Sequence, residues 1–245
     1  MFDLLIRNAQ VLDGTGAPAY LADVAVKDGK IAAVGKIAGE AAETVDAAGL
    51  TLAPGFIDVH GHSDFFMPLD PARASKLLQG VTTELCGQCG LGPAPVTEQN
   101  YSLYHKYLSQ QGIPMYPDDR TFTSFSAYLS RMEQTPAGIN LAYFIPHGTV
   151  RLAVMGFSHD APDDRQLAQM RELVEDAMQA GALGLSTGLA YAPGRFAATD
   201  ELAALTEPVG RYGGVYTSHL RDQGDQLEQS VQEAIDIARR GGEVE

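Results

Sequence analysis

The sequence contains few cysteines and no tryptophan. Only Cys86 and Cys89 occur in 245 residues, three positions apart. Two cysteines cannot supply the several bridges on which small secreted proteins depend, so a disulfide framework is excluded. Reduced thiols and a cytoplasmic location are the resulting expectation.

Basic residues and long apolar runs are also scarce. There are 17 lysines and arginines against 31 aspartates and glutamates, and the formal net charge is −14. Nucleic acids and anionic membrane surfaces attract basic patches, so this balance argues against both partners. No stretch approaches the roughly 18 apolar residues of a membrane span, and the N-terminal residues lack the features of a signal peptide. The sequence leaves the oligomeric state open.

Residues 1–54 are predicted to form a small β unit. Short apolar segments are separated by turn residues, and Asp28-Gly29 is typical of a two-residue hairpin turn. We expect the strands to pair in an antiparallel arrangement that strands from elsewhere complete. The segments with a strand pattern are 3–8, 10–12, 22–26, 31–34, 44–46 and 50–52.

Residues 55–245 alternate between strand and helix patterns, with a polar, tyrosine-rich insertion at about 96–136. This alternation predicts an α/β fold with a parallel sheet, either doubly wound or a (β/α)8 TIM barrel. Ligand-type side chains after each strand favour the barrel. About five strand–helix units are present, so we expect the barrel to be incomplete in this chain. The predicted strands are 55–60, 80–86, 139–145, 182–186 and 214–219, and the predicted helices are 71–78, 125–132, one capped by Asp160, 200–211 and one containing Leu227, Val231 and Ile235. The helix capped by Asp160 is predicted to carry one apolar face, formed by Leu167, Met170, Leu173, Val174, Ala177 and Met178.

The segment from Pro54 to Asp64 carries the most informative pattern. Apolar residues 56–59 lead directly into His60-Gly61-His62. If the strand extends through His60, the two histidines share a face and both imidazoles reach one point beyond its end. Neutral imidazole is the commonest protein ligand for transition metals. A pair of surface histidines is the alternative, but the apolar lead-in favours a metal site, with Asp64 in a supporting position.

A cysteine and His219 add two further zinc-ligand types on neighbouring strand ends. Thiolate suits Zn²⁺ better than Mg²⁺ or Ca²⁺. A zinc site with an open position generates a hydroxide that can attack an amide carbonyl. Cys86 and Cys89 could instead form a redox pair or half of a structural Cys₄ site, but the sequence shows no matching βαβ context and no second cysteine pair.

Three more residues are candidates for binding a substrate. His147 and Ser186 lie at strand ends, and Tyr191 lies in the glycine-containing loop that follows Ser186. Each residue also has an ordinary structural interpretation. A strand-end histidine can belong to the core, and a loop tyrosine can serve only to pack the loop.

These segments together resemble the amidohydrolase superfamily, and within it the N-acyl-D-amino-acid deacylase (D-aminoacylase) family. The resemblance covers essentially the whole chain. The His-x-His segment marks the superfamily, whereas the cysteine segment is specific to the deacylases, with Gln88 at a position where that family often has Asn. The matching segments are PGFIDVHGH at 54–62, GVTT at 80–83, GQCG at 87–90, PAP at 93–95, GLSTGLAY at 184–191 and YTSHLRD at 216–222.

The resemblance implies a zinc enzyme, with one or two ions, that removes the acyl group from small-molecule N-acyl-D-amino acids. His60, His62, Cys89 and His219 would hold the metal, with Cys89 in place of the carboxylated lysine of many relatives, and Tyr191 would contact the substrate. The first 50 residues would form part of a small β-sandwich. The family's next metal-binding histidine, its catalytic aspartate and its substrate-binding arginine are expected beyond residue 245. We therefore expect these 245 residues to be part of the enzyme and to be poorly soluble or inactive alone.

Two other functions remain open from the sequence. The first is another amidohydrolase, such as a hydantoinase-like or dihydroorotase-like cyclic amidase. Such enzymes usually carry a bridging lysine, and this chain has few lysines, none at a predicted strand end. The second is a metal-binding protein without catalytic activity.

Overall fold

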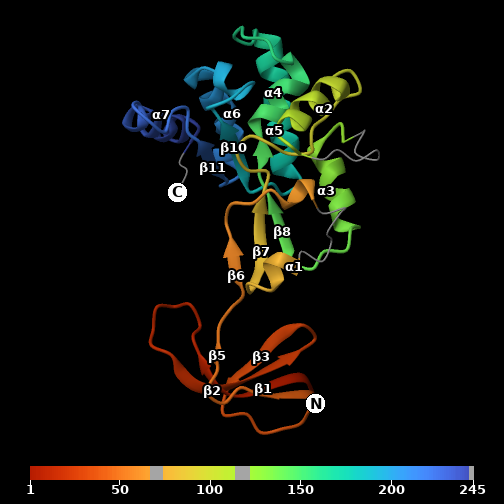
Figure 1. Cartoon of the computed structure of the whole chain (residues 1–245), viewed down its shortest axis with the longest axis vertical. Helices are drawn as coiled ribbons and strands as arrows, with labels where there is room; N and C mark the ends of the chain where they lie inside the picture. Colours follow the sequence, from red (N-terminus) through yellow and green to blue (C-terminus); the bar gives the residue numbers. More distant parts are fainter. Residues whose placement is uncertain (67–73, 114–121, 243–245) are drawn as a thin grey trace. The chain divides into compact units, whose positions relative to one another are not determined.

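The computed structural model describes residues 1–66, 74–113 and 122–242. The chain divides into two compact units, Met1–Phe56 and Ile57–Glu245. Each unit is built around its own sheet structure (Figure 1). Within the described ranges, no helix has the length and apolar character needed to cross a membrane.

The N-terminal unit is a five-stranded mixed sheet. Its strands are β1 (Phe2–Val11), β2 (Tyr20–Lys27), β3 (Lys30–Gly35), β4 (Ala41–Asp46) and β5 (Thr51–Leu52), in the order β3-β2-β1-β4, with β5 also paired to β1. β1, β2 and β3 are antiparallel as expected, but β4 and β5 run parallel to β1. The expectation of a purely antiparallel unit was therefore wrong, because the chain crosses from β3 to the other side of β1 before it re-enters the sheet.

The β2–β3 hairpin closes at the predicted turn. Asp28 and Gly29 have φ angles of 51° and 71°, and two positive φ angles in a two-residue loop match the right-handed twist of the flanking strands. Buried apolar residues of the sheet form a cluster inside the unit. That cluster contains Ala9, Val11, Ala22, Val24 and Ala47.

In its described residues, the larger unit has six short strands in two three-stranded sheets. The first has the order β6-β7-β8 and the second the order β11-β10-β9. β7 is parallel to β8, and β9, β10 and β11 are mutually parallel. The strands are β6 (Phe56–Asp58), β7 (Val81–Cys86), β8 (Asn140–Tyr143), β9 (Ile145–Pro146), β10 (Gly184–Gly188) and β11 (Val215–His219). The predicted strand at 139–145 thus contributes to both sheets.

Helices alternate with these strands, as the sequence predicts. They are α1 (Ala74–Leu77), α2 (Tyr101–Gln110), α3 (Phe125–Glu133), α4 (His147–Met155), α5 (Asp164–Gln179), α6 (Thr199–Arg211) and α7 (Leu227–Arg240), with short 3-10 helices η1 (Ser63–Phe65) and η2 (Gly194–Phe196). α2 and α4 were not predicted. Residues 71–73 of the predicted helix at 71–78 lie outside the described residues, and the described part is α1.

α5 begins later than predicted. Its N-cap is Asp163, not Asp160, and Asp163 forms a capping box with Gln166. Reciprocal bonds of this kind satisfy two backbone N–H groups that a helix start otherwise leaves unpaired. The predicted apolar face of α5 packs into a cluster of buried apolar residues that includes Cys86, Ile145 and Leu185, here called the main core. Met170 and Val174 have no exposed surface in it.

Candidate metal centre

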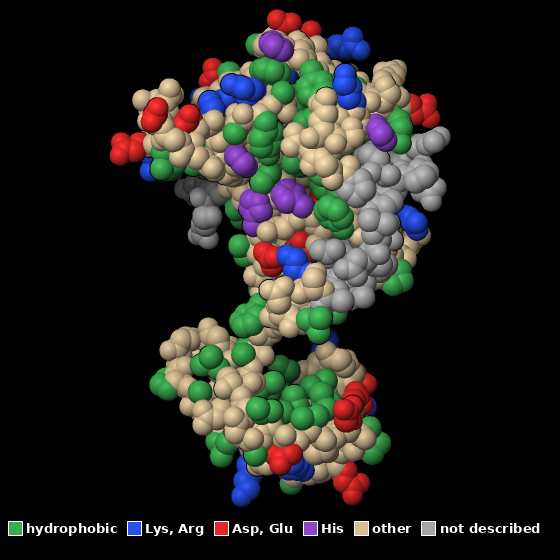
Figure 2. Space-filling view, in the orientation of Figure 1, with side chains coloured by type: hydrophobic (Ala, Val, Ile, Leu, Met, Phe, Trp, Pro, Cys, Tyr) green, Lys and Arg blue, Asp and Glu red, His purple; other side chains and the backbone are tan. Residues whose placement is uncertain are grey.

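His60 and His62 lie on a turn rather than on a strand. β6 ends at Asp58, whose carboxylate accepts a hydrogen bond of 3.2 Å from the backbone N–H of His60. This bond turns the chain before His60, so the prediction of a strand through His60 was wrong. The two imidazole rings nevertheless come close, with centroids 5.7 Å apart and planes inclined by 75°. Figure 2 shows histidine side chains gathered on one face of the larger unit.

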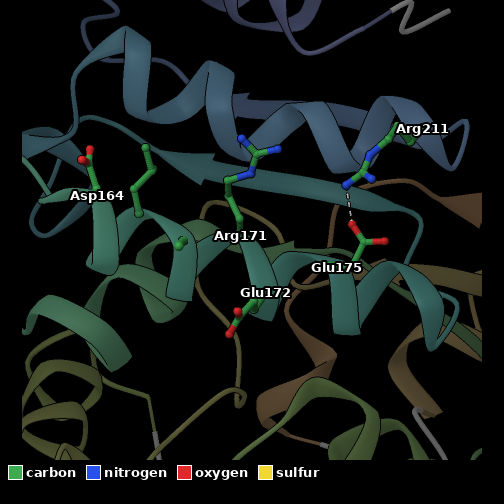
Figure 3. A pocket seen from close by; sticks show the side chains of 7 residues that line it. Asp164, Arg171, Glu172, Glu175 and Arg211 are labelled. Carbon is green, nitrogen blue, oxygen red and sulfur yellow. Dashed lines mark hydrogen bonds and ion pairs between the residues drawn. The ribbon is translucent and has the colours of Figure 1, made fainter.

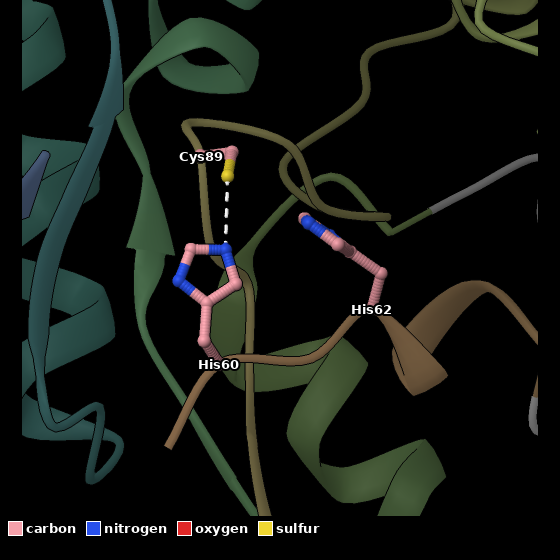
Figure 4. Close-up of side chains that lie close together, drawn as sticks. All are labelled: His60, His62 and Cys89. Carbon is pink, nitrogen blue, oxygen red and sulfur yellow. Dashed lines mark hydrogen bonds between the residues drawn. The ribbon is translucent and has the colours of Figure 1, made fainter. Parts of the chain in front are cut away.

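Cys89 reaches the same point from the loop after β7. Its backbone has a left-handed φ of 59°, and Gly87 and Gly90 beside it also have positive φ angles. The Cys89 Sγ atom lies 3.1 Å from Nε2 of His60. One donor atom from each of His60, His62 and Cys89 lies within 4.8 Å of the other two (Figure 4). The structure thus brings together three of the four predicted ligands.

Cys86 does not belong to this group of three donors. It has no exposed surface and belongs to the main core. Burial raises the pKa of its thiol well above the ordinary value, helped by the nearby carboxylates of Asp64 and Glu84. A thiol in this state is chemically inert and a poor metal ligand. Cys86 therefore lies in the main core, and Cys89 lies in the cluster of possible metal ligands.

The protonation state of His62 suits a metal ion, whereas the metal-free environment of Cys89 favours its neutral thiol. Burial, followed by the neighbouring His60, lowers the pKa of His62, which favours the neutral imidazole that binds metals. The Nδ1 atom of His62 is buried and has no hydrogen-bond partner. Burial raises the pKa of the Cys89 thiol, and a hydrogen bond with Tyr191 opposes this shift. Two imidazole nitrogens and a sulfur form a donor set typical of a borderline-soft divalent cation.

Tyr191 lies between Cys89 and His219. Its hydroxyl donates a hydrogen bond of 2.6 Å to the backbone carbonyl of Cys89. Its ring meets that of His219 edge to face, with centroids 5.2 Å apart. His219 is the last residue of β11 and lies outside the group of three close donors. Tyr191 therefore connects residues 87–90, the loop that carries Cys89 and is called the thiol loop from here on, to the strand end that carries the fourth predicted ligand.

Ser186 of β10 forms hydrogen bonds with the backbone of the thiol loop. It has no exposed surface; its hydroxyl accepts a hydrogen bond of 3.1 Å from the Gly90 N–H and donates one to the Gly87 carbonyl. The Ser186 hydroxyl thus accepts one hydrogen bond and donates another, and its two partners are backbone groups on either side of Cys89. This position differs from the one expected for a residue that binds substrate.

His147 is also enclosed rather than exposed to a pocket. It begins α4, has no exposed surface, and its Nε2 atom lies 3.1 Å from Glu201 of α6. Arg151 donates to the same carboxylate at 3.1 Å. These three side chains form a buried ionic network between two helices. The core interpretation of His147 describes this position better than the substrate-binding one.

Two supporting residues were not recognised from the sequence. Gln88 donates a hydrogen bond of 3.0 Å to the Val59 carbonyl and accepts one of 3.1 Å from Thr217, so it connects the thiol loop to the His60 turn and to β11. Glu84 of β7 is buried and accepts hydrogen bonds from Ser63. An acidic residue in an otherwise neutral strand was the signal that could have identified Glu84.

Asp64 lies in η1, directly after the histidines, and its supporting role at a metal site stays a prediction. It is buried and accepts a hydrogen bond of 3.1 Å from the Gly87 N–H. Burial raises the pKa of its carboxyl group to about 8. Asp64 thus links η1, which follows the histidines, to the beginning of the thiol loop.

A separate groove lies between α5 and α6 (Figure 3). Its charged lining residues include Arg171 and Arg211, which form ion pairs with Glu207 and with Glu175 respectively. Neither arginine therefore presents an uncompensated charge. The residues that line the groove are Asp164, Leu167, Ala168, Arg171, Glu172, Glu175 and Arg211, and none is a predicted site residue.

Comparison with known proteins finds curated relatives that match along almost the whole chain. A D-aminoacylase of Alcaligenes xylosoxydans xylosoxydans is 38% identical over 239 residues, which cover 97% of this chain and 48% of that protein. An N-acyl-D-glutamate deacylase of the same organism is 35% identical over 241 residues, which cover 98% of this chain and 48% of that protein. The chain spans about half the length of the curated relatives it matches.

A solved structure shows the same similarity in three dimensions. It is the N-acyl-D-glutamate deacylase of Bordetella bronchiseptica, complexed with zinc and a phosphonate inhibitor. The TM-score is 0.88 at 36% sequence identity, and the match covers 97% of this chain and 49% of that one. The sequence pattern of the Amidohydrolase family matches residues 43–237. Since that match takes in most of the residues, the chain belongs to the amidohydrolase family.

Proposed function

We propose that the chain is part of a zinc-dependent amide hydrolase that removes the acyl group from N-acyl-D-amino acids. The observation that carries this proposal is the convergence of His60, His62 and Cys89, whose donor atoms lie within 4.8 Å of one another. The relatives named D-aminoacylase and N-acyl-D-glutamate deacylase match along almost the whole chain, which supports this substrate class.

We assign the metal site to His60, His62 and Cys89, with His219 as a further ligand from β11, for one or two zinc ions. Zinc bound there would supply the Lewis-acid chemistry of amide hydrolysis. The imidazoles of His60 and His62 and the thiolate of Cys89 would hold the ion, and the Tyr191 hydroxyl fixes the Cys89 backbone. We place the acid–base carboxylate outside residues 1–245, because Asp64 is buried and accepts a hydrogen bond from the Gly87 N–H.

The proposal extends to the architecture. We assign residues 55–245 to the first part of a (β/α)8 TIM barrel and residues 1–54 to part of a small β-sandwich. Parallel strands that alternate with helices support the barrel. A cytoplasmic location is proposed because the two cysteines are free. The substrate is a small molecule.

A cyclic amidase with a bridging lysine is less consistent with the site. Cys89 occupies the position beside His60, and Lys76 forms ion pairs with Asp58 and Glu84 instead.

The assay for this proposal uses the full-length protein with zinc supplied. N-acetyl-D-methionine, N-acetyl-D-aspartate and N-acetyl-D-glutamate are tested, and release of the free D-amino acid is measured alongside the bound zinc. The L-enantiomers are the matched controls. We expect hydrolysis of at least one D-substrate and little of its L-enantiomer. A protein that binds zinc but cleaves none of the three would contradict the proposal and indicate a metal-binding protein without this activity.

A further inference from the structure

The turn that carries His60 and His62 is anchored at both ends by carboxylates. Before the turn, Asp58 accepts a hydrogen bond of 3.2 Å from the His60 N–H. After it, Glu84 accepts a hydrogen bond of 3.2 Å from the Ser63 N–H and another from the Ser63 hydroxyl. The two histidines therefore lie between two fixed points of the backbone.

Lys76 of α1 joins these two carboxylates. Its ammonium group forms an ion pair with Asp58 and lies 3.6 Å from Glu84. The side chain of Glu84 is only 1% exposed. A buried carboxylate needs an opposite charge and hydrogen bonds, because its removal from water is costly, and Lys76 and Ser63 supply both. We call Asp58, Lys76 and Glu84 the carboxylate–lysine bracket.

Glu84 also touches the turn directly. A Cβ atom added to Gly61 would overlap the Glu84 carboxylate, so the backbone between the two histidines lies against this group. The Gly61 N–H donates a hydrogen bond of 3.0 Å to the Leu85 carbonyl, which fastens the same point to β7. β7 ends at Cys86, and its following loop carries Cys89. One strand thus fixes both the histidine turn and the thiol loop.

We propose that the carboxylate–lysine bracket positions the metal ligands His60 and His62, with Glu84 as its principal residue. The inference rests on the proposed metal site and adds positioning residues to it. Groups hydrogen-bonded behind metal ligands orient them, and loss of such groups typically lowers metal affinity by about 10- to 100-fold. Because the bracket acts through the backbone of the turn, its loss displaces both imidazoles together and leaves Cys89 in place.

The test compares Glu84→Gln with a matched variant, Glu201→Gln, in the full-length protein. Glu84→Gln keeps the shape of the side chain and removes the charge that faces Lys76. Glu201 is likewise enclosed and ion-paired, to Arg151, but makes its bonds away from the turn. Zinc affinity is measured by competition with a chromophoric chelator. The visible spectrum of the Co²⁺-substituted protein reports ligand geometry, and thermal unfolding reports stability.

Glu84→Gln should weaken zinc binding by about 10- to 100-fold and shift the Co²⁺ ligand-field bands, while the Cys89 thiolate-to-Co²⁺ charge-transfer band persists. Glu201→Gln should lower the unfolding temperature without changing zinc affinity or the Co²⁺ bands.

Lys76→Met should weaken zinc binding, as Glu84→Gln does, and Lys76→Arg should bind zinc more tightly than Lys76→Met. Zinc affinity and Co²⁺ bands in Glu84→Gln equal to those of the wild type would overturn the inference, while the proposed function would stand. A wild-type protein that binds no zinc would overturn both.

If Glu84→Gln does not fold, Ser63→Ala provides the same test. This variant removes one hydrogen bond to Glu84 and keeps the ion pair with Lys76. Weaker zinc binding at the wild-type unfolding temperature would support the positioning role. Unchanged zinc binding with unchanged Co²⁺ bands would overturn it.

Discussion

The hydroxyl of Tyr191 donates a hydrogen bond of 2.6 Å to the backbone carbonyl oxygen of Cys89. Cys89 has a left-handed φ of 59°, a conformation that non-glycine residues keep only where their surroundings impose it. Gly188, the last residue of β10, makes room for the contact, because a Cβ atom there would overlap both the Cys89 carbonyl and the Tyr191 hydroxyl. The thiol is therefore fixed from two strands, β7 and β10.

Tyr191→Phe should loosen the thiol loop. The variant keeps the ring beside His219 and loses the hydrogen bond to Cys89, so we expect a stability loss of about 1 kcal/mol. The metal-free protein should also react faster with a thiol reagent, because Cys89 becomes more accessible. Reaction rates are followed with a chromogenic disulfide. Tyr212→Phe, which removes an exposed hydrogen bond to Glu175, is the control and should leave the rate unchanged. Equal rates in Tyr191→Phe and wild type would rule out this role.

The two cysteines should have separable effects. Cys89→Ala removes a donor from the cluster, so the purified protein should lose bound zinc. Cys86→Ala should retain zinc and lose about 1 kcal/mol of stability through a small cavity, because Cys86 packs in the main core. Zinc content by plasma mass spectrometry and urea unfolding measure the two effects. Full zinc content in Cys89→Ala would remove Cys89 from the site.

Local sequence patterns were sufficient for much of the fold. Asp28-Gly29 predicted its hairpin because both residues tolerate positive φ, and the apolar spacing in α5 predicted the face that carries Met170 and Val174. α4 was missed because Pro146-His147-Gly148 reads as a turn, although Pro146 takes an extended conformation that suits a helix N-cap. These differences arise where a local signal is compatible with two conformations and tertiary packing selects one.

The candidate site was only partly predictable for the same reason. His60, His62 and Cys89 are recognisable by residue type, and a short stretch of sequence joins the two histidines. Ser186 and Glu84 act through contacts with backbone that is 96 and 21 residues away in sequence. Nothing local in the sequence identifies such a partner. Their roles follow from which strands become neighbours, and the sequence pattern does not specify that.

Ser186→Ala should reduce stability rather than substrate affinity. The variant removes the acceptor for the Gly90 N–H and the donor to the Gly87 carbonyl. Leaving buried polar groups unpaired costs about 1 to 3 kcal/mol. Urea unfolding measures this loss, and steady-state kinetics of the full-length protein measure KM. A large rise in KM at wild-type stability would instead assign Ser186 to substrate binding.

The protein should lose stability in acid partly through Glu201. Its carboxylate bonds to His147 and to Arg151, each at 3.1 Å, and all three side chains are enclosed. Burial alone raises the pKa of Glu201, but the hydrogen bond from His147 and the charges of His147 and Arg151 outweigh it and hold this pKa below its ordinary value. A carboxyl group with a lowered folded pKa stabilises the fold above its unfolded pKa, and this contribution disappears as the pH falls through the folded pKa.

We therefore expect the free energy of unfolding of the wild type to decrease below about pH 4.3, the ordinary pKa of glutamate, and Glu201→Gln to lose part of this dependence. At neutral pH the variant should be less stable by about 3 kcal/mol, because Arg151 remains charged in a buried site without its partner. Urea unfolding at a series of acidic to neutral pH values measures both effects. The control is Asp200→Asn, because Asp200 is 86% exposed where it pairs with Arg240 and an exposed ion pair contributes little. A Glu201→Gln protein with the pH profile of the wild type would show that this network does not govern acid stability.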